Sequence, residues 1–162
     1  MSQIDELLDA NEAHAAVRGP SGDAPPRRRL TVLTCMDARI DPLAVFGLRE
    51  GDAQILRNAG ARVTDDVLRG LALSAHLMGV DTVVVVQHTR CGLVDTTGED
   101  LRGTTGADTD FLVIHDHAET LRSDVDALAA TAYLTPIREI AGLVYDVDSG
   151  AVTEHVRWER SS

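Results

Sequence analysis

The chain has 162 residues, of which 44% are hydrophobic and 25% charged, and its 26 acidic against 15 basic residues give a net charge of −11. A field of that sign opposes general binding to nucleic acids or to anionic membranes. Aromatic residues make up only 3% of the chain, which does not fit a base-stacking platform for single-stranded nucleic acid. All 15 basic residues are arginines, and the absence of lysine excludes Schiff-base chemistry and lysine-dependent phosphate loops.

The length and apolar content suit one domain over residues 1–162, with residues 1–29 as an N-terminal arm and linker. No apolar run approaches the ~20 residues that a membrane helix needs. The first residues are acidic and amphipathic and do not resemble an export signal. We therefore expect a cytoplasmic protein.

The N-terminal segment predicts a helix over residues 2–17 that begins at Ser2, carries Asp5 in its first turn, and ends before Gly19. Its apolar face is weak, so we expect it to pack on a partner subunit. Residues 19–29 are rich in proline, glycine and arginine and predict a solvated linker.

Strand and helix patterns alternate through the rest of the chain. They predict strands at 30–34, 53–56, 82–87, 142–147 and 152–156, and helices at 43–48, 64–78 and 119–128. Residues 95–110 are polar with little periodicity, and residues 111–114 are either a short strand or irregular. Four consecutive valines in the strand at 82–87 indicate that both of its faces are covered. The order predicts an α/β fold with a mostly parallel sheet flanked by helices.

Two of these strands end at residues that commonly bind metals. Cys35 follows the first strand, His88 follows the strand at 82–87, and Cys91 comes three residues later. If the two strands are neighbours, their carboxyl ends lie about 4.8 Å apart, close enough for three donors to reach one ion at ~2.0–2.3 Å. Two thiolates and one imidazole suit zinc. Three protein ligands without a fourth are typical of a catalytic zinc, so we expect one Zn²⁺ per chain.

Asp37 and Arg39 follow Cys35 at alternate positions. In an extended chain all three side chains project to the same side, which would place a carboxylate and a guanidinium beside the metal. Asp37 can then accept a hydrogen bond from a metal-bound water, while Arg39 keeps the carboxylate ionised and oriented. The alternative interpretation is an ordinary surface ion pair.

Three motifs in this order resemble the β-class carbonic anhydrases, in particular their compact bacterial and archaeal members. The motifs are T-C-M-D-A-R (34–39), R-N-A-G (57–60) and H-T-R-C-G (88–92). The resemblance implies a parallel sheet with flanking helices and an obligate homodimer or homotetramer, with an N-terminal helical arm lying across the partner. It also implies reversible hydration of CO₂ to bicarbonate by metal-bound hydroxide, with zinc held by Cys35, His88 and Cys91 and with Asp37 and Arg39 as the catalytic dyad. The sequence leaves open whether Asp37 can also bind the metal directly.

Other features of the site are less specific. The resemblance implies a loop near the substrate pocket, and two apolar residues are weaker candidates for its wall; these residues are Asn58, Ala59, Gly60, Val63 and Leu93. Three histidines are proton-carrier candidates only because histidine titrates near neutral pH: His76, His115 and His117. Arg90 stands where the family pattern leads us to expect a small or acidic residue.

Two alternative functions remain open from the sequence. The same metal and dyad would serve a hydrolase of carbonyl sulfide or carbon disulfide, and a catalytically silent zinc-binding module would need the ligands alone. A thiol-based redox protein is disfavoured because neither Cys35 nor Cys91 has a resolving cysteine close in sequence.

Overall fold

The sheet of the molecule has five strands in the order β2-β1-β3-β4-β5. A computed structural model describes residues 2–161. The first four strands pair in parallel, and the last strand runs antiparallel to its neighbour. The strands are β1 (Leu30–Cys35), β2 (Ala53–Asn58), β3 (Thr82–His88), β4 (Glu139–Tyr145) and β5 (Val152–Glu159). The prediction of a mostly parallel sheet is confirmed.

The helices begin where short polar side chains can cap them. The Thr64 hydroxyl accepts a hydrogen bond from the Val67 N–H, and the Asp41 carboxylate accepts from the backbone of the first turn after it. The helices are α1 (Gln3–Val17), α2 (Pro42–Val45), the 3₁₀ turn η1 (Ala59–Ala61), α3 (Asp65–Leu77), α4 (Gly98–Thr105) and α5 (His117–Ala130). Among residues 2–161, no helix has the length and apolar character needed to cross a bilayer.

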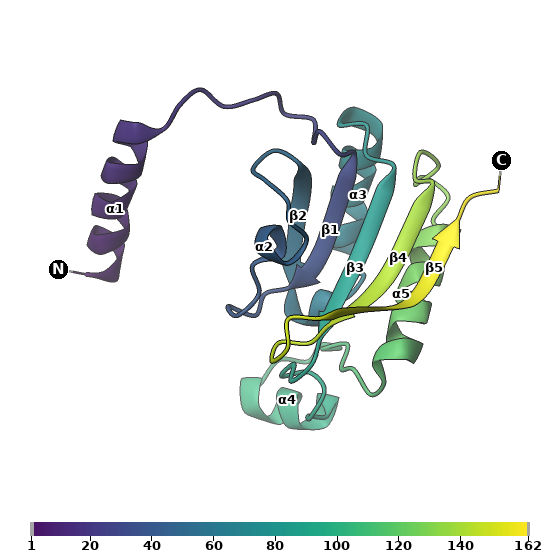
Figure 1. Cartoon of the computed structure of the whole chain (residues 1–162). Helices are drawn as coiled ribbons and strands as arrows, with labels where there is room; N and C mark the ends of the chain where they lie inside the picture. The colour runs from purple at the N-terminus through teal and green to yellow at the C-terminus, as the bar shows by residue number, and fades with distance from the viewer. Residues whose placement is uncertain (1, 162) are drawn as a thin grey trace.

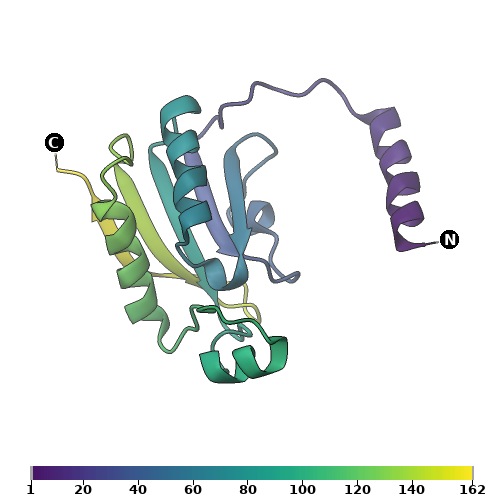
Figure 2. The same ribbon diagram turned by 180° about the vertical axis from the view of Figure 1, so that it is seen from behind.

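The main core lies between the sheet and helices α3 and α5, which cover the same face (Figures 1 and 2). Val83 and Val85 of β3 pack there against Leu71 of α3 and Val125 of α5, all of them buried. The intervening valines of β3 point to the opposite face. The four-valine run therefore reflects contacts on both faces of a central strand.

Within the described part of the chain, the opposite face of the sheet carries only the short helix α2, beside β1 and β2 (Figure 1). A groove of about 350 Å³ remains open there between β1, β3 and β4. Helix α1 does not fill it, because α1 stands apart from the sheet at the end of an extended segment and buries none of its residues (Figures 1 and 2). One face of the sheet thus keeps exposed apolar surface.

Several local features differ from what the sequence pattern predicts, among them α2, which ends at Val45 instead of Leu48, and β5, which extends to Glu159. Helix α4 forms within the polar stretch because Thr97 caps it and Gly106 ends it, although it has no buried residue that would give a periodic apolar pattern. Residues 111–114 are irregular, and Ile114 is bonded to Leu93 through a single backbone hydrogen bond. Strand β4 begins at Glu139, three residues before its predicted start, because it pairs with β3 over that length as well.

Candidate metal centre and catalytic site

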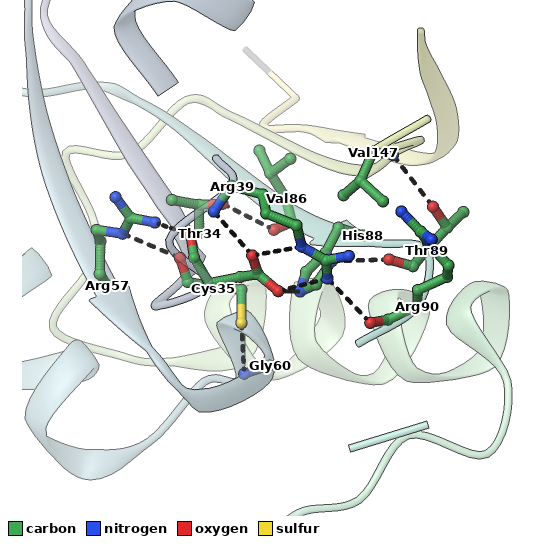
Figure 3. A network of polar contacts seen from close by, with 11 residues as sticks. Thr34, Cys35, Arg39, Arg57, Gly60, Val86, His88, Thr89, Arg90 and Val147 are labelled. Carbon is green, nitrogen blue, oxygen red and sulfur yellow. Dashed lines mark hydrogen bonds and ion pairs between the residues drawn. The ribbon is translucent and has the colours of Figure 1, made fainter. Parts of the chain in front are cut away.

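Three potential metal ligands meet at the carboxyl edge of the sheet, and Figure 3 shows two of them, Cys35 and His88. Cys35 is the last residue of β1, His88 is the last residue of the neighbouring strand β3, and Cys91 lies in the turn that follows. All three side chains are buried, and one donor atom from each lies within 4.8 Å of the others. The parallel pairing of β1 with β3 accounts for this convergence.

The donor set fits a zinc ion. The Nδ1–H of His88 donates to the Thr89 carbonyl at 2.9 Å, which leaves Nε2 as the ring atom free to coordinate. That Nε2 is buried and has no hydrogen-bond partner among the described residues, an arrangement that is costly unless another ligand satisfies it. Both cysteines are free thiols, so the site offers two soft sulfur donors and one imidazole.

The two thiols affect each other's ionisation. The neighbouring Cys91 thiol lowers the pKa of Cys35, whereas Cys35 and burial raise the pKa of Cys91. The pair therefore favours the thiolate form at Cys35 over that at Cys91. A bound metal cation would favour the thiolate form of both.

Asp37 and Arg39 form a two-pronged ion pair beside this cluster. The guanidinium donates from Nε to Asp37 Oδ1 at 2.9 Å and from Nη2 to Oδ2 at 2.6 Å. The hydrogen bonds from Arg39 hold the pKa of the Asp37 carboxyl well below its usual range. Asp37 Oδ2 lies 3.8 Å from the Nε2 of His88. The pair is therefore part of the metal centre rather than a distant surface contact.

Arg57 and Arg90 attach this pair to the surrounding backbone (Figure 3). Arg57, on β2, donates to the carbonyls of Cys35 at 3.0 Å and Asp37 at 2.7 Å. The Arg90 carbonyl accepts from Arg39 Nη2 at 3.1 Å, while the Arg90 side chain pairs with Asp148 of the β4–β5 turn at 2.6 Å. Arg57 has no role predicted from the sequence, although the parallel pairing of β2 with β1 places it next to the site.

A cavity of about 230 Å³ opens onto the three ligands. Ala59, Gly60 and Leu93, which the sequence predicts near a substrate pocket, line this cavity. Val63 packs against the main core instead, and both polar atoms of the Asn58 amide bond to the backbone of Arg62. Met36 and Gly92 also line the cavity; they were not anticipated, although each is adjacent in sequence to a ligand.

The candidate proton carriers do not line this cavity. His76 Nε2 lies 2.8 Å from the Tyr133 carbonyl, and His117 Nδ1 donates to Gln87 Oε1 at 2.8 Å. His115 is exposed. The geometry therefore gives none of the three a direct path to the metal centre.

Comparison with known proteins agrees with the geometry. Residues 30–132 match the carbonic anhydrase family. The chain is 32% identical to β-carbonic anhydrase 1 of Mycobacterium tuberculosis over 161 residues, covering 95% of this chain and 98% of that protein. The chain belongs to the β-class carbonic anhydrase family. Carbonic anhydrases are enzymes, and the site described above lies within the matched region.

Solved structures extend the similarity over the whole fold of this β-carbonic anhydrase. The crystal structure of carbonic anhydrase from Streptococcus mutans superposes with a TM-score of 0.86 at 38% identity, covering 96% of this chain and 99% of that one. A carbon disulfide hydrolase from Saccharolobus solfataricus is 43% identical over 98 residues, which cover 60% of this chain and 47% of that protein. The scaffold is thus shared by proteins named for two different substrates.

Proposed function

We propose that this β-carbonic anhydrase hydrates CO₂ reversibly to bicarbonate with one zinc ion held by Cys35, His88 and Cys91. The observation that carries the proposal is the convergence of two sulfurs and one imidazole nitrogen within 4.8 Å, next to the ionised carboxylate of Asp37. Zinc bound by such a set supplies the Lewis acidity that makes an attacking water acidic near neutral pH. The side chains of the protein orient the reacting water and form the cavity for the substrate.

Asp37 acts as a hydrogen-bond acceptor that orients the reacting water. Its low pKa keeps it a carboxylate at neutral pH, so it accepts hydrogen bonds and does not serve as a proton donor. The two contacts from Arg39 prevent the carboxylate from rotating. A carboxylate has about four lone-pair positions, so acceptor capacity remains for the water.

The cavity suits a small apolar substrate. Leu93 and Ala59 supply apolar walls, and Gly60 lets the backbone pack closely against Leu93, because a Cβ at position 60 would lie 2.9 Å from Leu93 Cδ1. CO₂ needs no hydrogen-bond donor to enter such a space, because it is uncharged and has no net dipole. The polar groups at the end of the cavity are then available for the reaction.

The Asp37→Asn variant tests the dyad. We expect it to keep about one zinc per chain and to lose roughly 100-fold or more in kcat/KM, because the amide presents a donor to the water and pairs poorly with Arg39. Zinc analysis and stopped-flow CO₂ hydration on the same samples measure both quantities. Asp66→Asn, in an exposed ion pair on α3, is the matched control and should behave as the wild type.

Two results would contradict these proposals separately. Full activity of Asp37→Asn would remove the dyad from the mechanism while leaving the zinc assignment intact. A wild-type protein that binds no zinc, or that binds zinc without hydrating CO₂, would overturn the proposed function.

Hydrolysis of carbon disulfide or carbonyl sulfide is the second candidate. The similarity to carbon disulfide hydrolases supports it, and the apolar cavity places no group that would distinguish these linear molecules from CO₂. Parallel assays of CO₂ hydration and hydrogen sulfide release on one preparation discriminate between the substrates. A kcat/KM for carbon disulfide above that for CO₂ would favour this second function.

We also propose that the chain forms a homodimer in which α1 packs on a second copy. Ile4, Leu7 and Leu8 of α1 share one helix face and are each more than 60% exposed. The groove on the opposite side of the sheet has an apolar floor that includes Val32 and Leu143. In this dimer, the apolar face of α1 from one copy would cover the groove of the other copy. A homotetramer would be built from two such dimers.

A cytoplasmic location is consistent with the thiols of the metal centre. Cys35 and Cys91 lie close together and are both reduced, and they can bind a metal only in that form. Reducing compartments keep such thiol pairs reduced.

A further inference from the structure

The turn that follows β2 has an unusual backbone. Gly60 has φ of 72° and the next residue, Ala61, has φ of 56°. A left-handed conformation is accessible to glycine but unfavourable for alanine. Ala61 is also fully buried in the main core. Other contacts must therefore hold this turn in place.

The side chain of Asn58 supplies one of these contacts. Its Nδ2 donates to the Arg62 carbonyl at 2.7 Å, and its Oδ1 accepts from the Arg62 N–H at 3.0 Å. The amide therefore closes the turn with one donor and one acceptor on the same residue. Among side chains of this length, only asparagine offers both in one plane.

Arg62 is a fixed anchor for this closure. Its guanidinium donates to the buried carboxylate of Asp124 at 2.8 Å and to the Leu112 carbonyl at 2.6 Å. Arg62 is thus attached both to α5 and to the segment before it. Because these contacts hold Arg62 in place, the hydrogen bonds between Asn58 and Arg62 also restrict the conformation of the turn.

The turn presents a hydrogen-bond donor to the metal centre. The Gly60 N–H donates to Cys35 Sγ at 3.4 Å (Figure 3). A Cβ at position 60 would lie 2.9 Å from Leu93 Cδ1 and 3.2 Å from Ile114 Cδ1. The backbone here is consequently packed against the cavity wall, and the direction of the N–H depends on the conformation of the whole turn.

We propose that Asn58 is a positioning residue of the metal centre: by closing the 58–62 turn, it aims the Gly60 N–H at the Cys35 sulfur and so strengthens metal binding. The inference rests on the zinc site of the proposed function. A hydrogen bond from an N–H orients a thiolate and offsets part of its charge. Loss of such a contact behind a metal ligand typically costs about 10- to 100-fold in metal affinity.

The test compares Asn58→Ala with Asn11→Ala, a substitution of the other asparagine of the chain, which lies on the exposed helix α1. Zinc affinity is measured by competition with a chelator, and the sulfur-to-metal charge-transfer band is recorded after substitution with cobalt(II). We expect Asn58→Ala to bind zinc at least 10-fold more weakly than the wild type and to shift the cobalt band. Asn11→Ala should change neither.

A second variant separates an effect on the conformation of the turn from an effect on the overall stability of the protein. Ala61→Gly allows the left-handed backbone without strain, so Asn58→Ala combined with Ala61→Gly should recover most of the zinc affinity. The double variant also decides the matter if Asn58→Ala alone does not fold. Recovery of both folding and affinity supports the proposal, whereas a folded double variant that binds zinc weakly overturns it.

Two further outcomes have distinct meanings. A lower melting temperature of Asn58→Ala with unchanged zinc affinity and cobalt spectrum would overturn the inference, since Asn58 would then support the fold alone. A wild-type protein that binds no zinc would instead refute the proposed function on which the inference rests.

Discussion

Arg57 joins the metal ligand and the dyad through the backbone. Its guanidinium donates to the carbonyl of Cys35 and to that of Asp37, from the strand beside β1. Arg39 in turn donates to the Arg90 carbonyl near Cys91. The relative positions of the carboxylate and the sulfurs are thus set by arginine–carbonyl contacts.

Arg57→Lys tests this role. A lysine ammonium is a single point charge and cannot bridge two carbonyls as a planar guanidinium does, so the Asp37 carboxylate should lose its fixed position. We expect zinc content to be unchanged and kcat/KM to fall roughly 10- to 100-fold. Zinc analysis and stopped-flow kinetics measure these quantities, and Arg69→Lys in the exposed pair with Asp66 is the control. Wild-type activity of Arg57→Lys would show that the strand pairing alone positions the loop.

At the residue scale, the sequence predicts what depends on spacing and misses what depends on backbone conformation. The structure brings Cys35, Asp37 and Arg39 to one site, but the predicted extended chain is wrong there, because the backbone turns after Asp37, whose carbonyl accepts a hydrogen bond from the Ile40 N–H at 3.2 Å. Asn58 was expected near the pocket, but its contacts depend on the positive φ at two later positions and on the anchoring of Arg62. Such geometry leaves no periodic pattern in the sequence.

At the scale of elements, β3 links the metal centre to the main core through α5. Gln87, which precedes the ligand His88, accepts a hydrogen bond from His117 in the first turn of α5. His117 is half-buried, and burial lowers its pKa. Protonation keeps the Nδ1–H donor, but burial disfavours the charged imidazolium at this packed position, and this gives the packing of α5 on β3 a dependence on pH.

The sign of this dependence follows from linkage. In the unfolded chain His117 takes up a proton near pH 6.5, whereas the folded protein resists protonation until lower pH. Its contribution to stability is therefore present above about pH 6.5 and lost as the pH falls below it. We expect His117→Asn, which keeps a donor for Gln87, to lose less unfolding free energy than the wild type between pH 7 and pH 5.5.

Denaturant titrations of both proteins at equal zinc saturation measure this difference. Comparing the two proteins cancels the pH dependence of metal release, which they share. His14→Asn on the exposed helix α1 is the control and should follow the wild type. Parallel stability curves for His117→Asn and the wild type would refute the assignment.

The order of the elements was predictable because strands and helices that build the core carry periodic apolar residues. Helix α3 buries Leu71 and its neighbours against the sheet, and its boundaries follow from Thr64 and Gly79. Helix α4 has no buried residue, so only its caps could have indicated it. The sequence thus predicts the elements packed in the core better than those on the surface.

At the scale of the whole molecule, two apolar surfaces are left uncovered by the other residues that the structure describes, 2–161. Helix α1 exposes Ile4, Leu7 and Leu8, and the sheet face opposite α3 and α5 keeps an open groove. Burying one such side chain contributes about 1.5–3 kcal/mol. Their exposure in one protomer is therefore the strongest structural argument for a second copy.

Ile4→Glu combined with Leu8→Glu tests the homodimer. Residues four apart share one helix face, so the two charges would oppose burial of the apolar side of α1. We expect the variant to sediment as a monomer at concentrations at which the wild type is a dimer. The melting temperature of the variant should be lower than that of the wild type, because the variant loses the stabilisation that dimerisation provides.

Ala13→Glu places the same charge on the opposite face of α1 and should leave the dimer intact. Sedimentation velocity over a range of concentrations distinguishes these cases. A dimer of unchanged strength in the double variant would show that α1 lies outside the interface, and a wild-type monomer would refute the homodimer.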